Sequence, residues 1–574
     1  MSEPLQGASS APFLTQLRSF GGIYWIANWM ELVERFAYYG VRVVLPVFMV
    51  LAIEDGGPQL DHVQKGTIYA VWAILQSFVP ILSGGFADQY GFKLNIALST
   101  ALKIIGYLVM GWCIPIAELM AGSSLAEARA AGLDRVFEVF FVGAMFLAVG
   151  TAIFKPGVQG MIGQEMPKQS ASLGWALFYQ VVNIGGFLGP FVAGYLRVLD
   201  WQYVFLVCAV AIALNFIPLF FFKEPERSAA KSPEDPLTLL YRSIQGLLEP
   251  RLFFFTITFA GFWLMFYQLF DILPNFIDDW VDSRGLASAL QGLFGQAAVP
   301  TLEGGNLTQE WMINFNALLI SFAAFLIGYL TGFLRSLQAI IVGIAISAAA
   351  IYGLGLSMSG WWTLGAIGLF SLGEMTASPT KLRYVSGIAP PGKQGQYLGY
   401  ANFTTGIGWS VGSIVAGSLY QEGGDKIVLA RRYLVEELGM ASEAVAEIRR
   451  GEVLETLQTK LGIDAFELRS LLWEAYEPYS MWLVFTAIGV ASMLAIVVYD
   501  WVLRRADARP DHSFNRHGNR WVLAALFPIV ALFIAATVAE FSLGLLLNTI
   551  FFGLMLVVAL LSGPHKSNGR VSTP

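Results

Sequence analysis

The first apolar run of the chain contains the stretch Glu31-Leu32-Val33-Glu34-Arg35-Phe36-Ala37-Tyr38-Tyr39-Gly40-Val41-Arg42. The run opens near Gly21 and continues past Val50, so it is long enough for a membrane-spanning helix, which needs ~20 residues. The quoted stretch nevertheless carries two carboxylates and two guanidinium groups. Because an ionisable side chain at membrane depth costs roughly 2.5–3.5 kcal/mol, such groups are expected to pair with one another or to face water.

The spacing of these residues favours one polar helix face. Glu31 and Arg35 are four positions apart, so they lie one turn apart on the same face. Tyr38 and Arg42 continue that face, and Glu34 borders it. We therefore expect the helix to line an aqueous cavity with this face. A structural ion pair that holds neighbouring helices together is the alternative.

The composition indicates a polytopic membrane protein, because 56% of the 574 residues are hydrophobic and only 13% are charged. The histidines, at positions 62, 512, 517 and 565, all fall in expected loops, so a proton relay inside the membrane would use carboxylates. Cys113 and Cys208 lie in apolar runs and are expected to be reduced packing residues. The polar segment before Gly21 shows no cleavage pattern, so we expect no signal peptide.

Apolar runs of spanning length divide the chain. We count about fourteen, near residues 21–51, 65–87, 94–117, 136–162, 171–198, 201–222, 252–280, 309–334, 336–357, 360–388, 396–420, 478–503, 520–540 and 541–563. The expected fold is all-α, with six-helix bundles at 21–222 and 252–503 and two additional C-terminal transmembrane helices at 520–563. Between and around them lie an N-terminal segment (1–20), a linker (223–251), a loop (504–519) and a tail (564–574) that we expect to be disordered.

Basic residues collect in the short loops on one side of the expected membrane, as at Lys93, Arg335 and Arg504, whereas Asp61 and Asp278 lie on the other side. This bias places both termini in the cytoplasm. Residues 421–475, on the acidic side, are highly charged but too long for the charge rule to apply. Their leucines at helical spacing predict a cap of two or three amphipathic helices, either a surface elaboration or a partner-binding module. Residues 286–308 are expected to form a loop without periodicity.

Six spans, a long linker and six further spans are the plan of a rocker-type secondary transporter. The loop after the second span reads Gly84-Gly85-Phe86-Ala87-Asp88-Gln89-Tyr90-Gly91-Phe92-Lys93. Its glycines permit a tight turn, and Asp88 and Lys93 can pair across helix ends that separate and rejoin. The pattern GxxxDxxGx[RK] resembles the signature of the major facilitator superfamily.

Four stretches resemble the proton-dependent oligopeptide transporter family within that superfamily. Residues 31–40 match its ExxERFxYYG pattern, and residues 150–156 (GTAIFKP), 178–185 (FYQVVNIG) and 373–379 (GEMTASP) resemble GTGxxKP, FYxxxNxG and GExxxSP. The resemblance extends from about residue 21 to residue 501, so the last two spans lie outside it. Bacterial relatives often carry two extra helices between the halves, but this linker is too polar to hold them.

The resemblance implies roles for particular residues. Glu31, Glu34 and Arg35 would couple proton movement to substrate binding, and Lys155 would pair with that cluster or with a substrate carboxylate. Tyr38, Arg42 and Asn183 would contact the substrate from the N-terminal half, and Glu374 would face its amino group. Further candidates are, for substrate binding, Tyr267, Gln268, Asn316 and Ser378 and, for gating, Asp88, Lys93, Asp271 and Lys381. The structural alternatives are a snorkelling Lys155 and a capped Glu374 carboxylate.

The residues themselves support such roles, because a zwitterion needs a cationic wall and an anionic wall, and the two charge sets lie in different halves. A carboxylate beside a cation stays ionised and takes a proton when the cation moves away.

The chain also departs from the family pattern. Tyr267-Gln268 stands where the family often has Glu before Gln, and Asp271, one turn on, could replace that outer-gate acid. Ala401 and Phe78 align with a pocket Trp and a pocket Tyr, so we expect an altered side-chain pocket.

The expected function is therefore proton-coupled import of di- and tripeptides or peptide-like zwitterions across a bacterial inner membrane. The alternative is a transporter or exporter of a modified peptide or non-peptide metabolite that uses the same residues. The sequence offers no nucleophile with a base and no metal-spaced cluster, so an enzyme is not expected. We expect no cofactor, no nucleic-acid partner and a monomer in the lipid bilayer. A sensor that uses residues 421–475 is a third possibility.

Overall fold

The computed structural model describes residues 12–222, 236–391, 393–507 and 514–561. The N-terminal half comprises α1 (Phe13–Arg18), α2 (Gly22–Phe48), α3 (His62–Tyr90), α4 (Phe92–Gly111), α5 (Cys113–Ala121), α6 (Leu125–Ala130), α7 (Val136–Glu165), α8 (Ala171–Leu199), α9 (Trp201–Ala213) and α10 (Phe216–Phe221). The short η1 (Ile53–Asp55) and η2 (Lys168–Ser170) connect them.

The C-terminal half begins after α11 (Pro236–Leu247). It comprises α12 (Pro250–Phe266), α13 (Gln268–Asp271), α14 (Leu273–Trp280), α15 (Arg284–Phe294), η3 (Gln296–Ala298), α16 (Gln309–Thr331), α17 (Ser336–Leu354), α18 (Gly360–Ile388), α19 (Gln394–Gly423) and α24 (Met481–Asp507). Two helices follow, α25 (Phe514–Ala539) and α26 (Leu543–Leu561).

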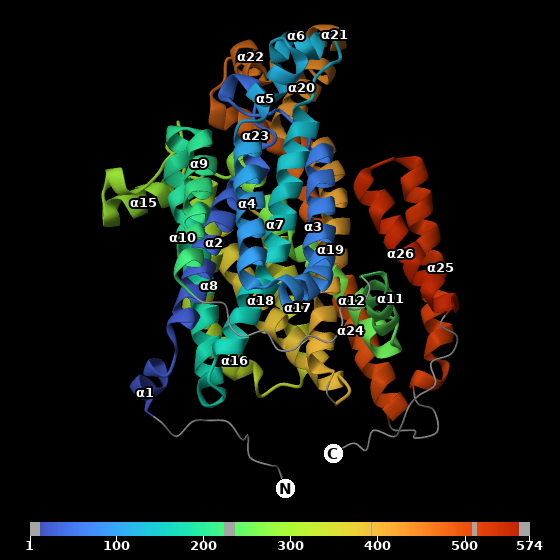
Figure 1. The fold of residues 1–574 in the computed structure, drawn as a ribbon. Helices are drawn as coiled ribbons and strands as arrows, with labels where there is room; N and C mark the ends of the chain where they lie inside the picture. Colours follow the sequence, from blue (N-terminus) through green and yellow to red (C-terminus); the bar gives the residue numbers. More distant parts are fainter. Residues whose placement is uncertain (1–11, 223–235, 392, 508–513, 562–574) are drawn as a thin grey trace.

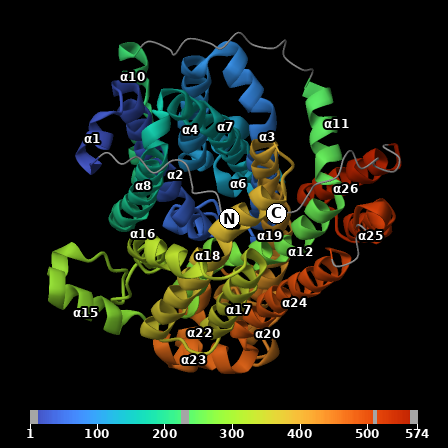
Figure 2. The same ribbon diagram turned by 90° about the horizontal axis from the view of Figure 1, so that it is seen from below.

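The two halves stand side by side as helical bundles, with α3 packed along α19 and α8 along α16 between them (Figure 2). The pair α25–α26 lies outside the bundles, and α26 contacts α3, α19 and α11. Phe551 of α26 packs edge-on against Phe78 of α3, and the Asn548 amide donates to Ser410 Oγ of α19 at 2.8 Å. Phe78 therefore contributes to the packing of the additional helices.

A cap covers one end of the bundles (Figure 1). It consists of α20 (Lys426–Glu436), α21 (Ser442–Ala446), η4 (Arg450–Glu452), α22 (Val453–Leu461) and α23 (Ala465–Tyr476), and η5 (Pro478–Ser480) leads into α24. The prediction of two or three helices was too low. Leu429 and Leu434 are buried, as their spacing predicts, whereas Leu438 is exposed. We call this end of the molecule the cap side.

The protein is an all-α, multi-pass membrane protein. Ten helical segments in the described residues are long and apolar enough to cross a membrane. Four other expected spans are α2, α3, α18 and α19, helices of 27 to 30 residues whose polar side chains lower their hydropathy. Together they make the two six-helix bundles and the two additional helices that the sequence predicts.

Three spans that the sequence predicts as continuous are broken. The breaks follow Gly111, Ala213 and Phe266, with a further interruption at Ile272. Pro115, Pro218 and Pro274 lie just beyond the first, second and last of these breaks. A proline removes one helical hydrogen bond and clashes with the carbonyl four residues earlier, which explains those three positions.

Other corrections concern segments outside the spans. Residues 286–308 contain most of α15 rather than only loop, and Leu286 and Ala287 bury one of its faces. The linker holds α11, and the loop 504–519 is helical at both ends, so His517 lies in α25. His62 is the buried first residue of α3 rather than a loop residue. His512, His565 and the predicted disordered tail lie outside the described residues.

Candidate substrate cavity and ion-pair cluster

A cavity of about 330 Å³ lies between the two halves. The N-terminal half lines it with residues of α2 and α8, among them Tyr38, Tyr39, Arg42, Tyr179 and Asn183. The C-terminal half contributes residues of α12, α16 and α18 and Tyr267, which lies between α12 and α13. Among these lining residues, Arg42 and Glu374 are the charged ones, and they come from opposite halves.

Glu374 is held at the wall of the cavity by α16. The Asn316 amide donates to Glu374 Oε2 at 2.9 Å and also lies 3.0 Å from Ser371 Oγ. Among the described residues, no cation lies within ion-pairing distance of this carboxylate. Since a carboxylate removed from water without a cation is costly, Glu374 is suited to receive a cationic group from a ligand. Ser378, one turn further along α18, does not line the cavity.

Aromatic rings form a large part of the remaining wall. Tyr267 lines the cavity and stacks on Trp409 of α19, with ring centroids 4.4 Å apart. Asn183 lines it from α8, where its amide donates to the Tyr179 carbonyl at 2.9 Å. Gln268 is fully buried and donates to the Leu264 carbonyl at 2.6 Å, so it does not reach the cavity.

The acidic and basic residues of α2 form a compact cluster. Arg35 pairs with Glu31 at 3.0 Å through Nε and with Glu34 through Nη2. Lys103 of α4 completes the cluster, with its Nζ 2.9 Å from Glu34 Oε1. Each of these four side chains is at most 5% exposed.

The prediction that this whole face of α2 lines the cavity is therefore wrong for Glu31, Glu34 and Arg35 in this conformation. Packing against α7 and α8, together with the Lys103 side chain of α4, buries them, while Tyr38 and Arg42 line the cavity. The cluster is nevertheless adjacent to the cavity wall, because the Arg35 guanidinium lies 5.4 Å from the Tyr38 ring centroid and 5.9 Å from that of Tyr39.

The sequence named Lys155 as a partner either of this cluster or of a substrate carboxylate, and Lys103 was missed. Lys155 is exposed, and it interacts electrostatically with the cluster without an ion pair to any described carboxylate. A signal for Lys103 was present, because it stands in the middle of the third apolar run, where ionisable residues are expensive.

On the cap side of the cavity, Arg42 pairs with Asp271 of α13. Asp271 Oδ2 also accepts hydrogen bonds from Trp409 Nε1 at 3.0 Å and Ser413 Oγ at 2.8 Å. Lys65 of α3 reaches the same region and donates to Asn275 Oδ1 at 2.7 Å. Asp271, which the sequence suggests as a substitute for the family's outer-gate acid, thus pairs with a basic residue of the other half.

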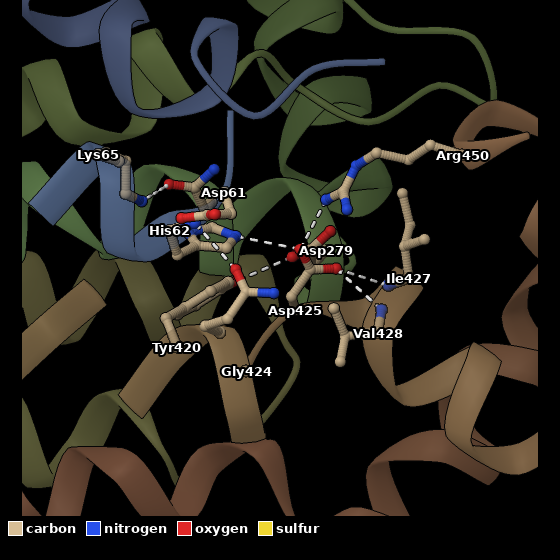
Figure 3. Close-up of polar contacts among 12 residues, drawn as sticks. Asp61, His62, Lys65, Asp279, Tyr420, Gly424, Asp425, Ile427, Val428 and Arg450 are labelled. Carbon is tan, nitrogen blue, oxygen red and sulfur yellow. Dashed lines mark hydrogen bonds and ion pairs between the residues drawn. The ribbon is translucent and has the colours of Figure 1, made fainter. Parts of the chain in front are cut away.

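Two further polar contacts join the halves at the cap side. Arg197 of α8 pairs with Asp278 of α14 and, at 3.1 Å, with Glu310 of α16. Asp425, between α19 and α20, lies 3.2 Å from His62 Nε2 of α3 and 2.6 Å from Arg450 Nη2 of the cap (Figure 3). These contacts link the two halves on the cap side.

The remaining gating candidates are less central. Lys381 is buried in α18, with its Nζ 4.5 Å from the Trp263 ring centroid and 3.4 Å from Thr405 Oγ1. Lys93 lies 4.8 Å from the Phe222 ring centroid. Asp88 belongs to the part of α3 whose side chains lie outside the described set, so its pairing with Lys93 stays a prediction.

Comparison with known proteins agrees with this architecture. The model of the Major Facilitator Superfamily matches residues 31–301. The chain is similar to Peptide transporter YePEPT of Yersinia enterocolitica, at 27% identity over 191 residues, which is 33% of this chain and 34% of that protein. It is similar to Dipeptide and tripeptide permease A of Erwinia pyrifoliae, at 23% identity over 231 residues, 40% of this chain and 41% of that one. The chain thus matches between a third and two fifths of the length of these relatives.

The fold also resembles that of solved transporters. A crystal structure of peptide transporter POT in complex with sulfate superimposes with a TM-score of 0.57 and 16% sequence identity, over 87% of this chain and 97% of that one.

The two bundles around a central cavity agree with the match of residues 31–301 to the model of the Major Facilitator Superfamily. Over a third to two fifths of its length the chain is similar in sequence to peptide transporters, and its fold resembles that of a solved POT transporter. The family and the fold point to a transporter rather than an enzyme.

Proposed function

We propose that this protein is a proton-coupled symporter that imports short peptides or peptide-like zwitterions by alternating access. The observation that carries the proposal is the charge pattern of the cavity. Its lining holds one base, Arg42, and one acid, Glu374, on opposite walls, with aromatic and amide side chains between them. A zwitterion can interact with both poles at once, whereas a ligand that carries a carboxylate but no amino group leaves Glu374 without a cationic partner.

The cavity volume agrees with a small substrate. Ligand sites commonly enclose about 300–1,000 Å³, and this one is at the lower limit, at about 330 Å³. The aromatic rings of Tyr267, Trp263 and Phe266 offer an apolar surface for substrate side chains. The names of the relatives, a peptide transporter and a dipeptide and tripeptide permease, support the same substrate class.

Alternating access would use the ionic contacts of the cap side. When a substrate carboxylate attracts Arg42, its pairing with Asp271 weakens, and the cap-side closure loses one of its links. Protons would enter the cycle at the Glu31–Glu34–Arg35 cluster, which lies directly behind the cavity residues Tyr38 and Tyr39. We place the cap outside the cell and both termini in the cytoplasm of a bacterial inner membrane, following the basic loops of the opposite side.

Reconstituted vesicles test the proposal. With an inward acid gradient, the protein should accumulate dialanine or another small zwitterion, and an uncoupler should release it. Failure to accumulate any peptide-like zwitterion would refute import. Outward movement of a preloaded modified peptide against its gradient would instead identify the exporter.

A further inference from the structure

The middle of α4 contains a lysine that the family resemblance does not explain. Lys103 belongs to a span-forming helix, its side chain is fully buried, and its Nζ lies 2.9 Å from Glu34 Oε1. A buried ammonium is strongly unfavourable unless it is paired, so its position implies a specific partner. That partner is the second carboxylate of the ExxER stretch.

Helix α7 provides a socket for this side chain. A Cβ atom at Gly150 would lie 2.8 Å from Lys103 Cγ, so glycine is needed for the lysine to pass between the helices. The ring centroid of Phe154 lies 3.9 Å from Nζ, within the range of a cation–π contact. Gly150 and Phe154 both belong to the stretch 150–156 that ends in Lys155-Pro156. Two residues of this motif, Gly150 and Phe154, therefore pack around the Lys103 side chain.

The charges of the cluster are balanced without Lys155. Glu31 and Glu34 supply two negative charges, and Arg35 and Lys103 supply two positive charges, within ion-pairing distance. Resting on the function proposed above, we propose that Lys103 is the counter-ion that positions Glu34 in the proton-coupling cluster, leaving Lys155 available for a substrate carboxylate. Lys103 acts through Glu34 and is a positioning residue.

This arrangement distinguishes the two carboxylates. Glu34 contacts two cations, whereas Glu31 contacts Arg35 alone among the described cations within ion-pairing distance. A carboxylate between two cations holds a proton less readily than one beside a single cation. The other ionisable groups that interact with Glu34 are Lys155 of α7 and the phenols of Tyr39 of α2 and Tyr107 of α4.

A double-mutant cycle in purified protein tests the pairing without any transport assay. The variants are Glu34→Gln, Lys103→Met and both together, with Glu34→Gln combined with Lys155→Met as the matched control. Each single change in the 34–103 pair should lower the melting temperature, because it leaves a buried charge uncompensated. The double variant should recover more than half of the summed loss, and the control pair should be additive.

Additive effects for residues 34 and 103, or coupling of 34 to 155 instead, would overturn the assignment. If Lys103→Met does not fold, the folding of the double variant Glu34→Gln/Lys103→Met shows whether the two residues pair. Its recovery as folded protein supports the pairing. Its failure, where Lys103→Arg folds, contradicts the pairing, because the lysine would then do more than neutralise Glu34.

The positioning role predicts a transport phenotype as well. In Lys103→Met, gradient-driven accumulation of dialanine should fall about tenfold, which corresponds to ~1.4 kcal/mol, while counterflow exchange should fall less than about threefold. The acid limb of its pH profile should move by about one pH unit to higher pH, because Glu34 has lost one cation, and Lys103→Arg should restore it.

An unchanged pH profile in folded Lys103→Met would refute the positioning role. If the wild-type protein accumulates no peptide, the proposed function is wrong. The double-mutant cycle of melting temperatures still shows in that case whether Lys103 is the partner of Glu34.

Discussion

Glu374 illustrates how single residues of the cavity can be tested. Its carboxylate is held by Asn316 and has no described cation beside it, so a substrate amino group would be its natural partner. Arg42, in contrast, already has a partner in Asp271, so a substrate must compete for it. The two charged groups of the cavity thus differ in their need for a ligand. Glu374 has no cationic partner among the described residues, whereas Arg42 would have to exchange Asp271 for the ligand.

Glu374→Gln should weaken the binding of dialanine about thirtyfold or more, because loss of one partner of a buried charge pair costs ~2–5 kcal/mol. N-acetyl-dialanine, which has no charged amino group, should be affected much less. Thermal-shift titration of both ligands measures the difference. Glu303→Gln, at an exposed position on the cap side, is the control, and an equal loss for both ligands would contradict the assignment.

At the scale of elements, Asp425 ties the cap to both halves. Its Oδ1 accepts from the Ile427 and Val428 amides at the start of α20, and its Oδ2 contacts His62 and Arg450. Burial alone would raise the pKa of Asp425, but the His62 hydrogen bond and the Arg450 guanidinium outweigh it and hold that pKa well below its usual range. The Asp425 carboxylate thus caps α20 and links it to the N-terminal half through His62.

The pH dependence of this contact follows from the depressed pKa. A carboxylate whose pKa is lowered by folding stabilises the protein above its unfolded value of about 3.9, and that contribution is lost as the pH falls further. Asp425→Asn should therefore destabilise the protein by roughly 3 kcal/mol at pH 7, and the difference from wild type should shrink below about pH 4.

Melting temperatures measured across that range check the prediction. Glu443→Gln, an exposed carboxylate of α21, should show neither effect. A difference between Asp425→Asn and wild type that stays constant down to pH 3 would show that the charge is not responsible.

At the scale of the whole molecule, the described conformation is closed at the cap side by contacts between the halves. Arg42–Asp271, Arg197–Asp278 and His62–Asp425 each join one half to the other. Because the energy of closure is shared by several contacts, removal of one should shift the population of conformers rather than abolish the fold.

Asp271→Asn should populate a conformer that is open at the cap side. Spin labels at Leu119 of α5 and Leu293 of α15, both exposed, report the separation of the halves by double electron–electron resonance. The native thiols, Cys113 and Cys208, are buried, which favours labelling of the introduced cysteines. We expect a longer distance component in Asp271→Asn, absent from wild type and from the exposed control Asp55→Asn. Identical distance distributions would contradict a gating role for Asp271.

The sequence by itself determined the membrane class, the two bundles with two additional helices, and the resemblance to a family of transporters. These follow from apolar length and from motifs within single spans, which are local properties of the chain. The sequence also singled out Asp271 as a candidate gating acid one turn after Tyr267, but its pairing with Arg42, 229 positions away, came from the tertiary structure.

Only the tertiary structure decided which lysine meets Glu34, because the depth and rotation of α4 and α7 against α2 are set by packing and not by spacing along the chain. The same packing buried Glu31, Glu34 and Arg35 behind Tyr38 and Tyr39, although helical spacing placed the first three on or beside the same face as Tyr38. It also joined His62 to Asp425, residues 363 positions apart, because a contact between distant segments requires that both bundles be folded and in register.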